Sequence, residues 1–345
     1  MKDHFSWQKM NENLQVSKDI PEIQEVFKNH YETKMPKVYD LQNDIIPVYN
    51  LSLEDLNNSD IQEDLHNTFF FYTGIVIIKN AYNPKIMDDY NKWCSDNLDV
   101  CKLDKNNKHP KQSDKFLLNN IVGRMSESNP DLLMELINND YFTSCIDILG
   151  VSKIGSSTGH WINPNSDRQS SHVDYPSHIG SGEFWNNSVD KYKNLITKYQ
   201  SDYVLPFFST QVLIAPQKMN KNNGSTEVVP CSHLLQDLDV LIQDKNIYED
   251  FEKSFMNIEL DKGDMLLFNR GLCHRGGKNI SSEPLNSLTI QCVWLWGVGQ
   301  EIIESSKVLE RLEKSQKFNE LDQEKKDKFK LRIDFPYPTN VKNSA

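Results

Sequence analysis

The second half of the chain is dominated by short segments rich in β-branched and aromatic residues, separated by glycine, proline and asparagine. Many short strands with turn residues between them are typical of a closed antiparallel sandwich or barrel. The sequence therefore predicts a mainly β core over residues 151–300, with helices flanking it. The segments that carry this prediction are Tyr203–Phe208, Thr210–Ala215, Thr226–Val229, Asn257–Leu260, Met265–Phe268 and Leu288–Trp296.

The regions on either side of this core have different patterns. Residues 1–52 are polar with scattered aromatics, and we expect an irregular or helical arm there. Residues 53–150 show helix-like apolar spacing around one short buried strand at Gly74–Ile78, which predicts a supporting layer. Residues 301–345 begin heavily charged with a helical period, which predicts a solvated helix and a tail. Because we find no internal repeat and no linker, we expect one domain over residues 1–345.

Composition argues against several classes of protein. The formal net charge of −11 argues against a broad nucleic-acid surface, because phosphate binding requires clustered lysine and arginine. The longest apolar run, near Phe69–Ile78, is about half the roughly 20 residues of a membrane span, and the polar start has no signal-peptide core. The six cysteines form no C-x-x-C pair, which favours a reducing compartment. We expect a cytoplasmic protein that binds neither nucleic acid nor membrane; its oligomeric state stays open.

Three residues in two segments have the pattern of a metal site. His172 and Asp174 are two positions apart, and on a strand such side chains share one face and can grip one ion together, although a lone H-x-D also arises by chance. His274 follows the turn and apolar strand of Lys262–Phe268 and is soon followed by two glycines, so its ring can enter a cavity with little crowding. Two histidines and a carboxylate on one side of Fe(II) leave positions open for dioxygen and a co-substrate. A zinc site is the alternative metal, and His233 is an alternative third ligand.

The order of these motifs resembles the phytanoyl-CoA dioxygenase family. After H-x-D come E-V-V-P-C-S-H at 227–233, K-G-D-M-L-L-F at 262–268 and C-H-R-G-G-K-N at 273–279, and the likeness extends over residues 53–298. The resemblance implies a double-stranded β-helix (jelly-roll, cupin-like) core that uses Fe(II), 2-oxoglutarate and dioxygen. It also implies that His274, and not His233, is the third ligand.

The resemblance further implies a reaction at an unactivated C–H bond of a small molecule. Dioxygen and 2-oxoglutarate would be consumed, giving succinate and carbon dioxide, while the substrate is hydroxylated, desaturated or oxidatively cyclised. Halogenating relatives lack the carboxylate that Asp174 provides, so its presence favours these outcomes. The general texture also resembles the algal kainoid synthases, which cyclise a prenylated amino acid, and an amino-acid-derived secondary metabolite is therefore one expected substrate.

One position departs from the family pattern. In the family, an arginine on the last core strand holds the far carboxylate of 2-oxoglutarate, because its fork matches a carboxylate. Leu285 stands at that position here, although Ser287 of the same motif is retained. If residues 266–274 form one regular strand, Arg270 shares the face of the distal histidine and Arg275 points away. Arg270 is therefore the predicted anchor, with a rim or surface arginine as the alternative.

Other side chains are expected near the co-substrate or the substrate. Asn163 resembles an asparagine that contacts the co-substrate in the family, while Gln211 and Ser287 are expected to form hydrogen bonds in the same pocket. Trp161 and Tyr175 are candidate substrate-binding aromatics, although aromatics beside a barrel core more often serve packing.

The sequence leaves two further questions open. His160 is close enough to the H-x-D segment to reach the pocket, but a surface or core role is the stronger expectation. The second class of function is a non-catalytic jelly-roll binding protein that has lost its co-substrate. Leu285 supports this second class, and the intact triad argues against it.

Overall fold

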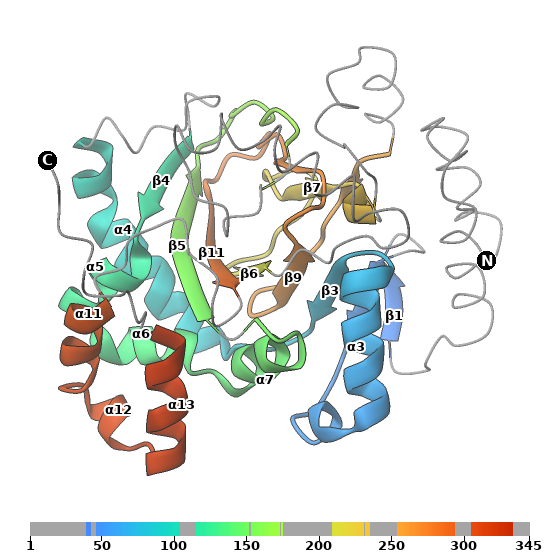
Figure 1. Ribbon diagram of the computed structural model, residues 1–345. Helices are drawn as coiled ribbons and strands as arrows, with labels where there is room; N and C mark the ends of the chain where they lie inside the picture. The colour runs from blue at the N-terminus through green and yellow to red at the C-terminus, as the bar shows by residue number, and fades with distance from the viewer. Residues whose placement is uncertain are drawn as a thin grey trace, which may run out of the picture.

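Two β-sheets form the centre of the protein (Figure 1). A cavity lies between them. The computed structural model describes residues 39–42, 46–103, 115–151, 153–172, 174, 209–230, 232–234, 254–293 and 305–333. In the larger, eight-stranded sheet all neighbours are antiparallel except β2 and β3, which run parallel. Its spatial order is β1 (Tyr39–Gln42), β2 (Ile46–Tyr49), β3 (Ile75–Ile78), β9 (Met265–Asn269), β6 (Ser209–Ile214), β11 (Leu285–Val293), β5 (Lys153–Ile162) and β4 (Lys115–Asn119).

The smaller sheet carries one of the predicted metal ligands at its edge. β10 (His274–Gly276) pairs with β7 (Thr226–Val228), which pairs in turn with β8 (Met256–Asn257). His172 extends this sheet through an isolated antiparallel bridge to His274. Neighbouring strands such as β9 and β6, or β10 and β7, are far apart in sequence. Strands of a double-stranded β-helix are interleaved in this way, whereas an up-and-down barrel pairs them in chain order.

Side-chain alternation along the larger sheet divides the core in two, because successive residues of a strand face opposite sides. On β6, Val212 and Ile214 pack with the helical layer, whereas Leu213 between them packs with the smaller sheet. On β9, Leu267 faces the helices and Phe268 faces the smaller sheet. The cavity between the sheets therefore lies on the side of the larger sheet that faces away from the helices.

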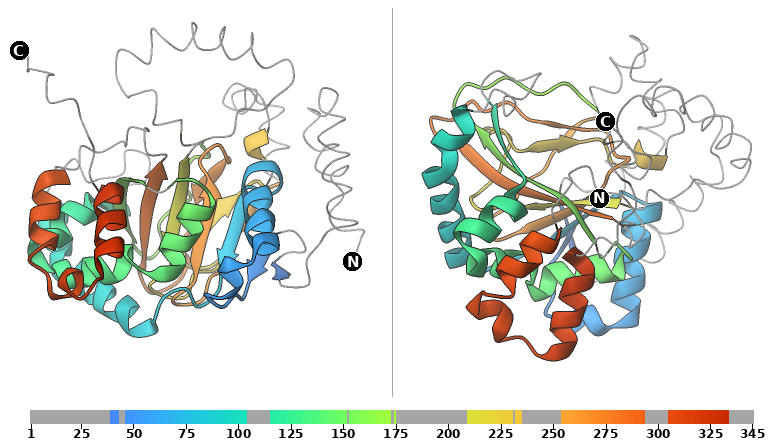
Figure 2. Two further views of the ribbon diagram at one scale, coloured as in Figure 1. Left: turned by 60° about the horizontal axis from the view of Figure 1, so that its bottom comes forward. Right: turned by 60° about the vertical axis from the view of Figure 1, so that its left-hand side comes forward.

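Helices pack mainly on the other face of the larger sheet (Figure 2). α5, α6 and α7 each begin at an asparagine, Asn120, Asn129 and Asn139, whose side chain accepts a hydrogen bond from the N–H three residues on, as a good N-cap does. The helical elements are η2 (Asp55–Asn57), α3 (Ser59–Phe71), α4 (Pro84–Leu103), α5 (Ile121–Ser128), α6 (Pro130–Ile137), α7 (Asp140–Ile148), η5 (Ser232–Leu234), α11 (Ser305–Leu312), α12 (Gln316–Asn319) and α13 (Gln323–Ile333). Within the described residues, no helix is both long and apolar enough to cross a membrane.

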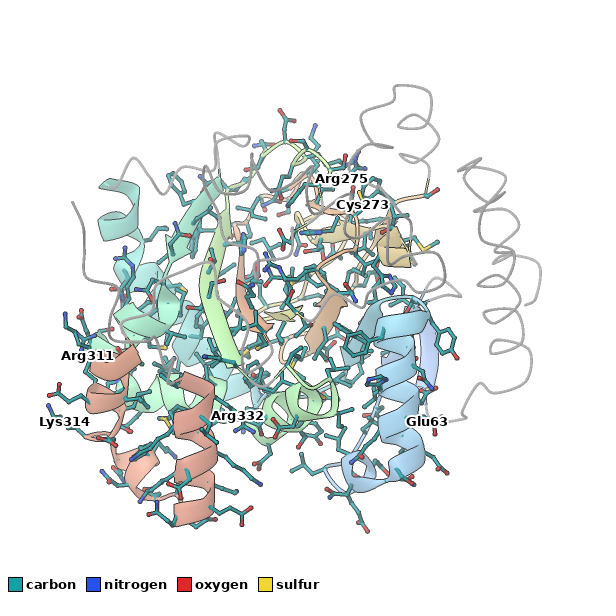
Figure 3. All side chains as sticks on the ribbon, in the orientation of Figure 1. Glu63, Cys273, Arg275, Arg311, Lys314 and Arg332 are labelled. Atoms are coloured by element: carbon teal, nitrogen blue, oxygen red, sulfur yellow. The ribbon has the colours of Figure 1, made fainter. Side chains whose placement is uncertain are left out.

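The charged C-terminal segment forms three helices outside this layer, where α11 and α12 pack on α5 and α6. Arg332 on α13 donates to Asp147 on α7, with 2.7 Å between Nη2 and Oδ2, and Arg311 on α11 pairs with Glu127 on α5 (Figure 3). The charges predicted to be solvated thus also tie this segment to the helical layer.

The N-terminal region differs from the sequence prediction. The expected irregular or helical arm is wrong for Ile46–Tyr49, which forms strand β2, with Ile46 and Tyr49 fully buried. The short β1 pairs with it. The physical reason is that β3 has a free edge beyond β9, and an apolar segment that pairs with this edge satisfies its backbone groups.

β5 is the second difference, because the predicted β-rich segments did not include it. It is ten residues long and lies between β11 and β4. Its residues at 156, 158 and 160 are polar and line the cavity, which weakens the apolar pattern expected of a central strand. Two predicted strand regions, Tyr203–Phe208 and the end of Leu288–Trp296 beyond Val293, lie outside the described residues.

Candidate metal centre

Backbone pairing brings the two predicted histidine ligands together. The N–H of His172 donates to the carbonyl of His274 at 3.0 Å, and the reverse bond is 2.9 Å long. Residues that exchange both backbone bonds lie directly opposite each other, with their side chains on the same face. The two imidazole rings accordingly lie beside each other, with their centroids 4.4 Å apart.

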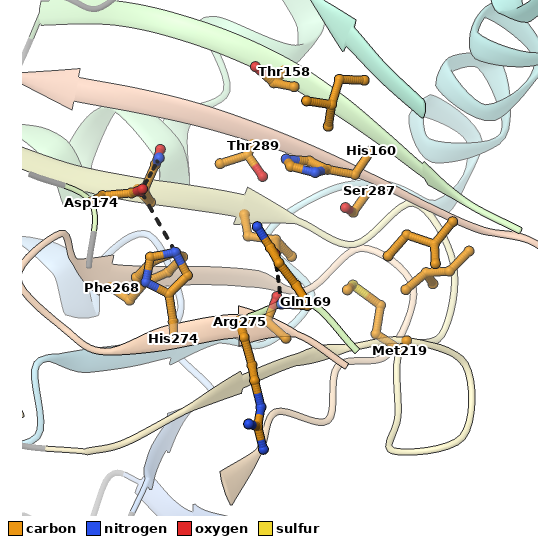
Figure 4. Close-up of a pocket in the computed structure, with 18 of the residues that line it drawn as sticks. Thr158, His160, Gln169, Asp174, Met219, Phe268, His274, Arg275, Ser287 and Thr289 are labelled. Carbon is orange, nitrogen blue, oxygen red and sulfur yellow. Dashed lines mark hydrogen bonds and ion pairs between the residues drawn. The ribbon is translucent and has the colours of Figure 1, made fainter. Parts of the chain in front are cut away.

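Asp174 completes a compact set of ligand atoms. Its carboxylate lies 4.0 Å from Nε2 of His172 and 3.8 Å from Nε2 of His274, and Figure 4 shows it facing His274 across one end of the cavity. The three ligand atoms lie within 4.8 Å of one another, and the described part of the chain has no other such group of histidine, cysteine and carboxylate side chains. Two histidines and one carboxylate on one side of a point form the facial arrangement that suits Fe(II).

Backbone carbonyls hold both rings in the form that binds metal. Nδ1 of His172 lies 3.0 Å from the carbonyl oxygen of Ser170, and Nδ1 of His274 lies 2.9 Å from that of Leu272. A carbonyl oxygen only accepts, so each neutral ring carries its proton on Nδ1. The lone pair is then on Nε2, the atom that faces Asp174, and such outer contacts orient ligating histidines in metal sites generally. The residues present therefore fit a metal ion.

Two side chains from other elements hold the carboxylate of Asp174 in its charged form. Gln211 on β6 donates from Nε2 to Oδ2 at 2.8 Å, and Nε of Arg270 lies 3.6 Å from the same oxygen. Burial alone would raise the pKa of Asp174, but the charge of Arg270, together with the Gln211 bond, holds it well below the usual range. Asp174 is therefore ionised at neutral pH, as a metal ligand would have to be.

Arg270 lies in a different place from the one that strand parity predicted. Residues 266–274 are not one regular strand, because β9 ends at Asn269 and β10, in the other sheet, begins at His274. Between them the chain turns, with the N–H of Leu272 donating to the carbonyl of Asn269 at 2.9 Å. Arg270 sits in this turn with no exposed surface, against Asp174 and not in the lining of the cavity. The side chain of Arg275 points away from the cavity, as predicted, and pairs with Glu227 (Figure 4).

The triad lies at one side of a cavity of about 330 Å³ between the two sheets. Volumes of roughly 300–1,000 Å³ are typical of small-molecule sites. Its lining residues come from both sheets and from the segment before His172: Leu117, Asn119, Ser156, Thr158, His160, Ile162, Gln169, His172, Asp174, Gln211, Leu213, Met219, Gly224, Thr226, Phe268, His274, Arg275, Gly276, Leu285, Ser287 and Thr289.

The structure brings some of the predicted pocket residues to this cavity and not others. Gln211 and Ser287 line it. Trp161 does not, because its strand neighbours His160 and Ile162 take the cavity face. Asn163 lies in the turn after β5 and is not in the lining either; Tyr175 lies outside the described residues.

Sequence reasoning missed several polar lining residues. Thr158 on β5 and Asn119 on β4 line the cavity, as does Gln169, whose Oε1 accepts a hydrogen bond from the N–H of Gly276 at 3.0 Å. A usable signal for β5 was the polar side chain at every second position from Ser156 to His160. That alternation is typical of a strand with one face on a polar cavity.

His233 is buried in this fold and is not part of the group formed by His172, Asp174 and His274. Its Nε2 lies 3.2 Å from the carbonyl oxygen of Phe70, and burial lowers its pKa to about 3. The ring packs so closely on Gly74 that a Cβ there would come within 2.6 Å of Nδ1. Gly74 also has a φ of +74°, which a side chain disfavours. The choice of His274 over His233 agrees with this placement.

Comparison with known proteins agrees with the fold. The family model for phytanoyl-CoA dioxygenase matches residues 195–285, and no curated protein sequence matches the chain. The structure is similar to the non-haem alpha-ketoglutarate-dependent carbocyclase SnoK from nogalamycin biosynthesis (TM-score 0.50, 13% identity, 71% of this chain and 87% of that chain). It is also similar to the epimerase SnoN of the same biosynthesis (TM-score 0.50, 14% identity, 69% of this chain and 82% of that chain).

These likenesses confirm the predicted fold class, a mainly β protein with a double-stranded β-helix core and flanking helices. The family match covers β6, β7 and β9 and includes His274. The two-histidine, one-carboxylate set is the ligand pattern of non-haem iron oxygenases. The chain therefore resembles the phytanoyl-CoA dioxygenase family over residues 195–285, and it carries a candidate set of metal ligands of this pattern.

Proposed function

We propose that this protein uses Fe(II), 2-oxoglutarate and dioxygen to hydroxylate, desaturate or oxidatively cyclise a small molecule at an unactivated C–H bond. The observation that carries the proposal is the triad of His172, Asp174 and His274 beside an internal cavity. The bound metal would supply dioxygen activation coupled to the conversion of 2-oxoglutarate into succinate and carbon dioxide.

The residues of this chain have three roles in that reaction. His172, Asp174 and His274 would hold the metal from one side, so that its other positions face the cavity. Gln211 and Arg270 keep Asp174 ionised and fixed in orientation. Apolar lining residues, Leu213, Ile162, Phe268 and Met219 among them, keep bulk water from the reacting centre.

The size and polarity of the cavity support a small, polar substrate. A volume of about 330 Å³ has to hold 2-oxoglutarate and the reacting part of the substrate. Ser156, Thr158, Asn119 and Gln169 offer hydrogen bonds along its walls. An amino-acid-derived secondary metabolite has matching polarity. The structurally similar SnoK and SnoN, a carbocyclase and an epimerase, illustrate the range of outcomes that this fold accommodates.

The proposed location is the cytoplasm. Cys145 and Cys292 are buried and free in the described part of the chain. Free thiols persist in reducing compartments, which supports this location.

Anaerobic titration tests the proposal. Adding 2-oxoglutarate to the Fe(II)-loaded protein should produce the visible metal-to-ligand charge-transfer band of a chelated 2-oxo acid. In air, the same mixture should release succinate. Asp174→Ala is the matched control and should show neither. Wild-type protein with measured stoichiometric iron and no band would contradict the proposal and favour a non-catalytic binding protein, for which Leu285 is the supporting residue.

A further inference from the structure

The far carboxylate of 2-oxoglutarate needs a partner in this cavity, and among the described residues no arginine or lysine side chain is placed to be that partner. A carboxylate taken out of water is costly unless a cation or several donors meet it. The described lining residues include no lysine and one arginine, Arg275. Its Nε donates to Glu227 at 2.6 Å, and its guanidinium lies 3.8 Å from the centroid of the Phe255 ring, outside the cavity. Leu285, at the position where the family carries its arginine, lines the cavity with an apolar side chain.

The guanidinium of Arg270 contacts Asp174 and does not face the cavity. The residue is fully buried and is not in the lining. Its charge acts on the ligand carboxylate and holds the pKa of that group low. A co-substrate in the cavity meets Asp174, and not Arg270, at this wall.

We infer that His160 on β5, together with Ser287 on β11, binds the far carboxylate of 2-oxoglutarate. Apart from the two ligand histidines and Arg275, His160 is the one lining side chain in the described residues that is able to carry a positive charge. Figure 4 shows His160 and Ser287 side by side, across the cavity from Asp174 and His274. A 2-oxo acid whose keto-acid end is chelated at the triad would extend its other end toward them. This inference rests on the proposed function and specifies which residues select its co-substrate.

Strand register explains why these two side chains meet. β5 and β11 are antiparallel, and His160 lies directly opposite Ser287, while Thr158 lies opposite Thr289. Side chains directly opposite on one face have Cβ atoms about 4.5–5.5 Å apart, so an imidazole and a hydroxyl can reach the same carboxylate. All four side chains line the cavity.

The row of polar pairs Thr158–Thr289 and His160–Ser287 ends at an apolar pair. Two residues further along the same face, Leu285 lies opposite Ile162, and both are apolar lining residues. His160 and Ser287 therefore occupy the last polar step before an apolar wall. A charged group that enters from the triad stops beside them, because going further would bury it against hydrocarbon.

Comparing the binding of two 2-oxo acids isolates the contribution that the far carboxylate makes to affinity. 2-Oxovalerate has the same chain length as 2-oxoglutarate but a methyl group in place of the far carboxylate. Both are titrated anaerobically into Fe(II)-loaded protein, with the charge-transfer band and calorimetry as readouts. Wild-type protein should bind 2-oxoglutarate much more tightly than 2-oxovalerate.

His160→Ala should weaken 2-oxoglutarate binding by roughly tenfold or more, the usual effect of losing a charge-assisted hydrogen bond, while 2-oxovalerate binding stays the same. His160→Gln keeps most of the side-chain volume and one hydrogen-bond donor, so its affinity for 2-oxoglutarate should lie between those of the wild type and His160→Ala. This variant supplies the comparison if the alanine variant does not fold. Adding Leu285→Arg to His160→Ala should restore the preference for 2-oxoglutarate, because the new guanidinium would lie one step away on the same face.

An unchanged ratio of the two affinities in His160→Ala overturns the inference, even if both acids bind more weakly, because a merely structural role lowers both equally. If the ratio of the two affinities changes in Arg270→Met but not in His160→Ala, the inference is wrong and Arg270 is the residue that binds the far carboxylate. A double variant that binds 2-oxovalerate without regaining the preference would put the far carboxylate elsewhere. Absence of the band in iron-loaded wild type is a different result, since it removes the proposed function itself and the inference with it.

Discussion

At the scale of single residues, short-range motifs predicted three candidate ligands that the structure brings together, but they did not predict the side chains that contact Asp174. His172 and Asp174 are neighbours in sequence, and His274 stands in a recognisable motif, so residue type and spacing were informative. Gln211 and Arg270 reach Asp174 from 37 and 96 positions away, and no local pattern marks such contacts. Strand parity failed for Arg270 because it assumed continuity through a turn.

We expect Arg270 to affect metal affinity through its contact with Asp174. In Arg270→Met, burial would raise the pKa of the ligand carboxylate with less opposition, so a proton would compete better with the metal. We expect Fe(II) affinity to fall by about 10- to 100-fold, the usual effect of losing a contact behind a ligand. Calorimetric titration of Fe(II) measures this. Arg275→Met is the matched control, a buried arginine paired with Glu227, and an equal loss there would refute a specific role of Arg270.

His233 gives the fold a defined sensitivity to acid. Its pKa is about 3 in the folded protein, against an ordinary value of 6.5, because burial disfavours the charged ring. Between these values the unfolded chain binds a proton that the folded protein does not, so this group lowers stability as the pH falls from 6.5 towards 3. The slope from one group is at most about 1.4 kcal/mol per pH unit.

His233→Gln keeps a donor for the carbonyl of Phe70 but does not titrate. Its free energy of unfolding, measured with urea at several pH values, should therefore fall less steeply with acid than that of the wild type. Parallel curves for the two proteins over this range would show that His233 is not the titrating group.

At the scale of elements, the spacing of apolar residues predicted the apolar strands but did not predict β5. β9 is buried along its whole length, and its run of apolar residues is visible in the sequence alone. β5 instead alternates cavity-facing polar residues with small residues that face the helices. A strand of this kind is defined by its neighbours β11 and β4, which a single sequence does not show.

Gly159 tests the helix-facing side of β5. A Cβ at this position would lie 3.0 Å from the hydroxyl of Tyr90 and 3.3 Å from atoms of Ile121 and Leu118. Gly159→Ala should therefore destabilise the protein by about 1–3 kcal/mol through overpacking. Metal affinity should stay unchanged, because the methyl group points away from the cavity. Urea unfolding and Fe(II) titration together check this; Thr158→Ala, on the cavity face, is the neighbouring control and should leave the stability nearly intact.

At the scale of the whole molecule, the candidate metal centre joins two parts of the chain that are about one hundred residues apart. His172 and His274 meet through one isolated backbone bridge, next to a cavity that the larger sheet closes. A jelly-roll topology was predictable from many short strands, but which strand ends meet was not, since register depends on contacts between distant segments.

A bound ion should stabilise the fold because only the folded protein brings the three ligands together. At a free metal concentration of one hundred times Kd, the gain is about 2.7 kcal/mol. Mn(II) or Ni(II), which avoid oxidation, should raise the Tm in thermal unfolding, and a chelator should reverse the rise. In Asp174→Ala, adding the metal ion should no longer raise the Tm. An equal rise in that variant would mean that the ion binds elsewhere.

The parallel pairing of β2 with β3 has a consequence for how the molecule behaves among its own copies. β3 is an apolar strand of four buried residues, Ile75–Ile78, and without β2 its backbone donors and acceptors would form an open ladder. Such a ladder is a template for a strand from any neighbouring molecule. Strands β1 and β2, which the sequence suggested were part of a loose arm, thus cover this ladder and leave the four-residue β1 as the edge that a neighbouring molecule would meet.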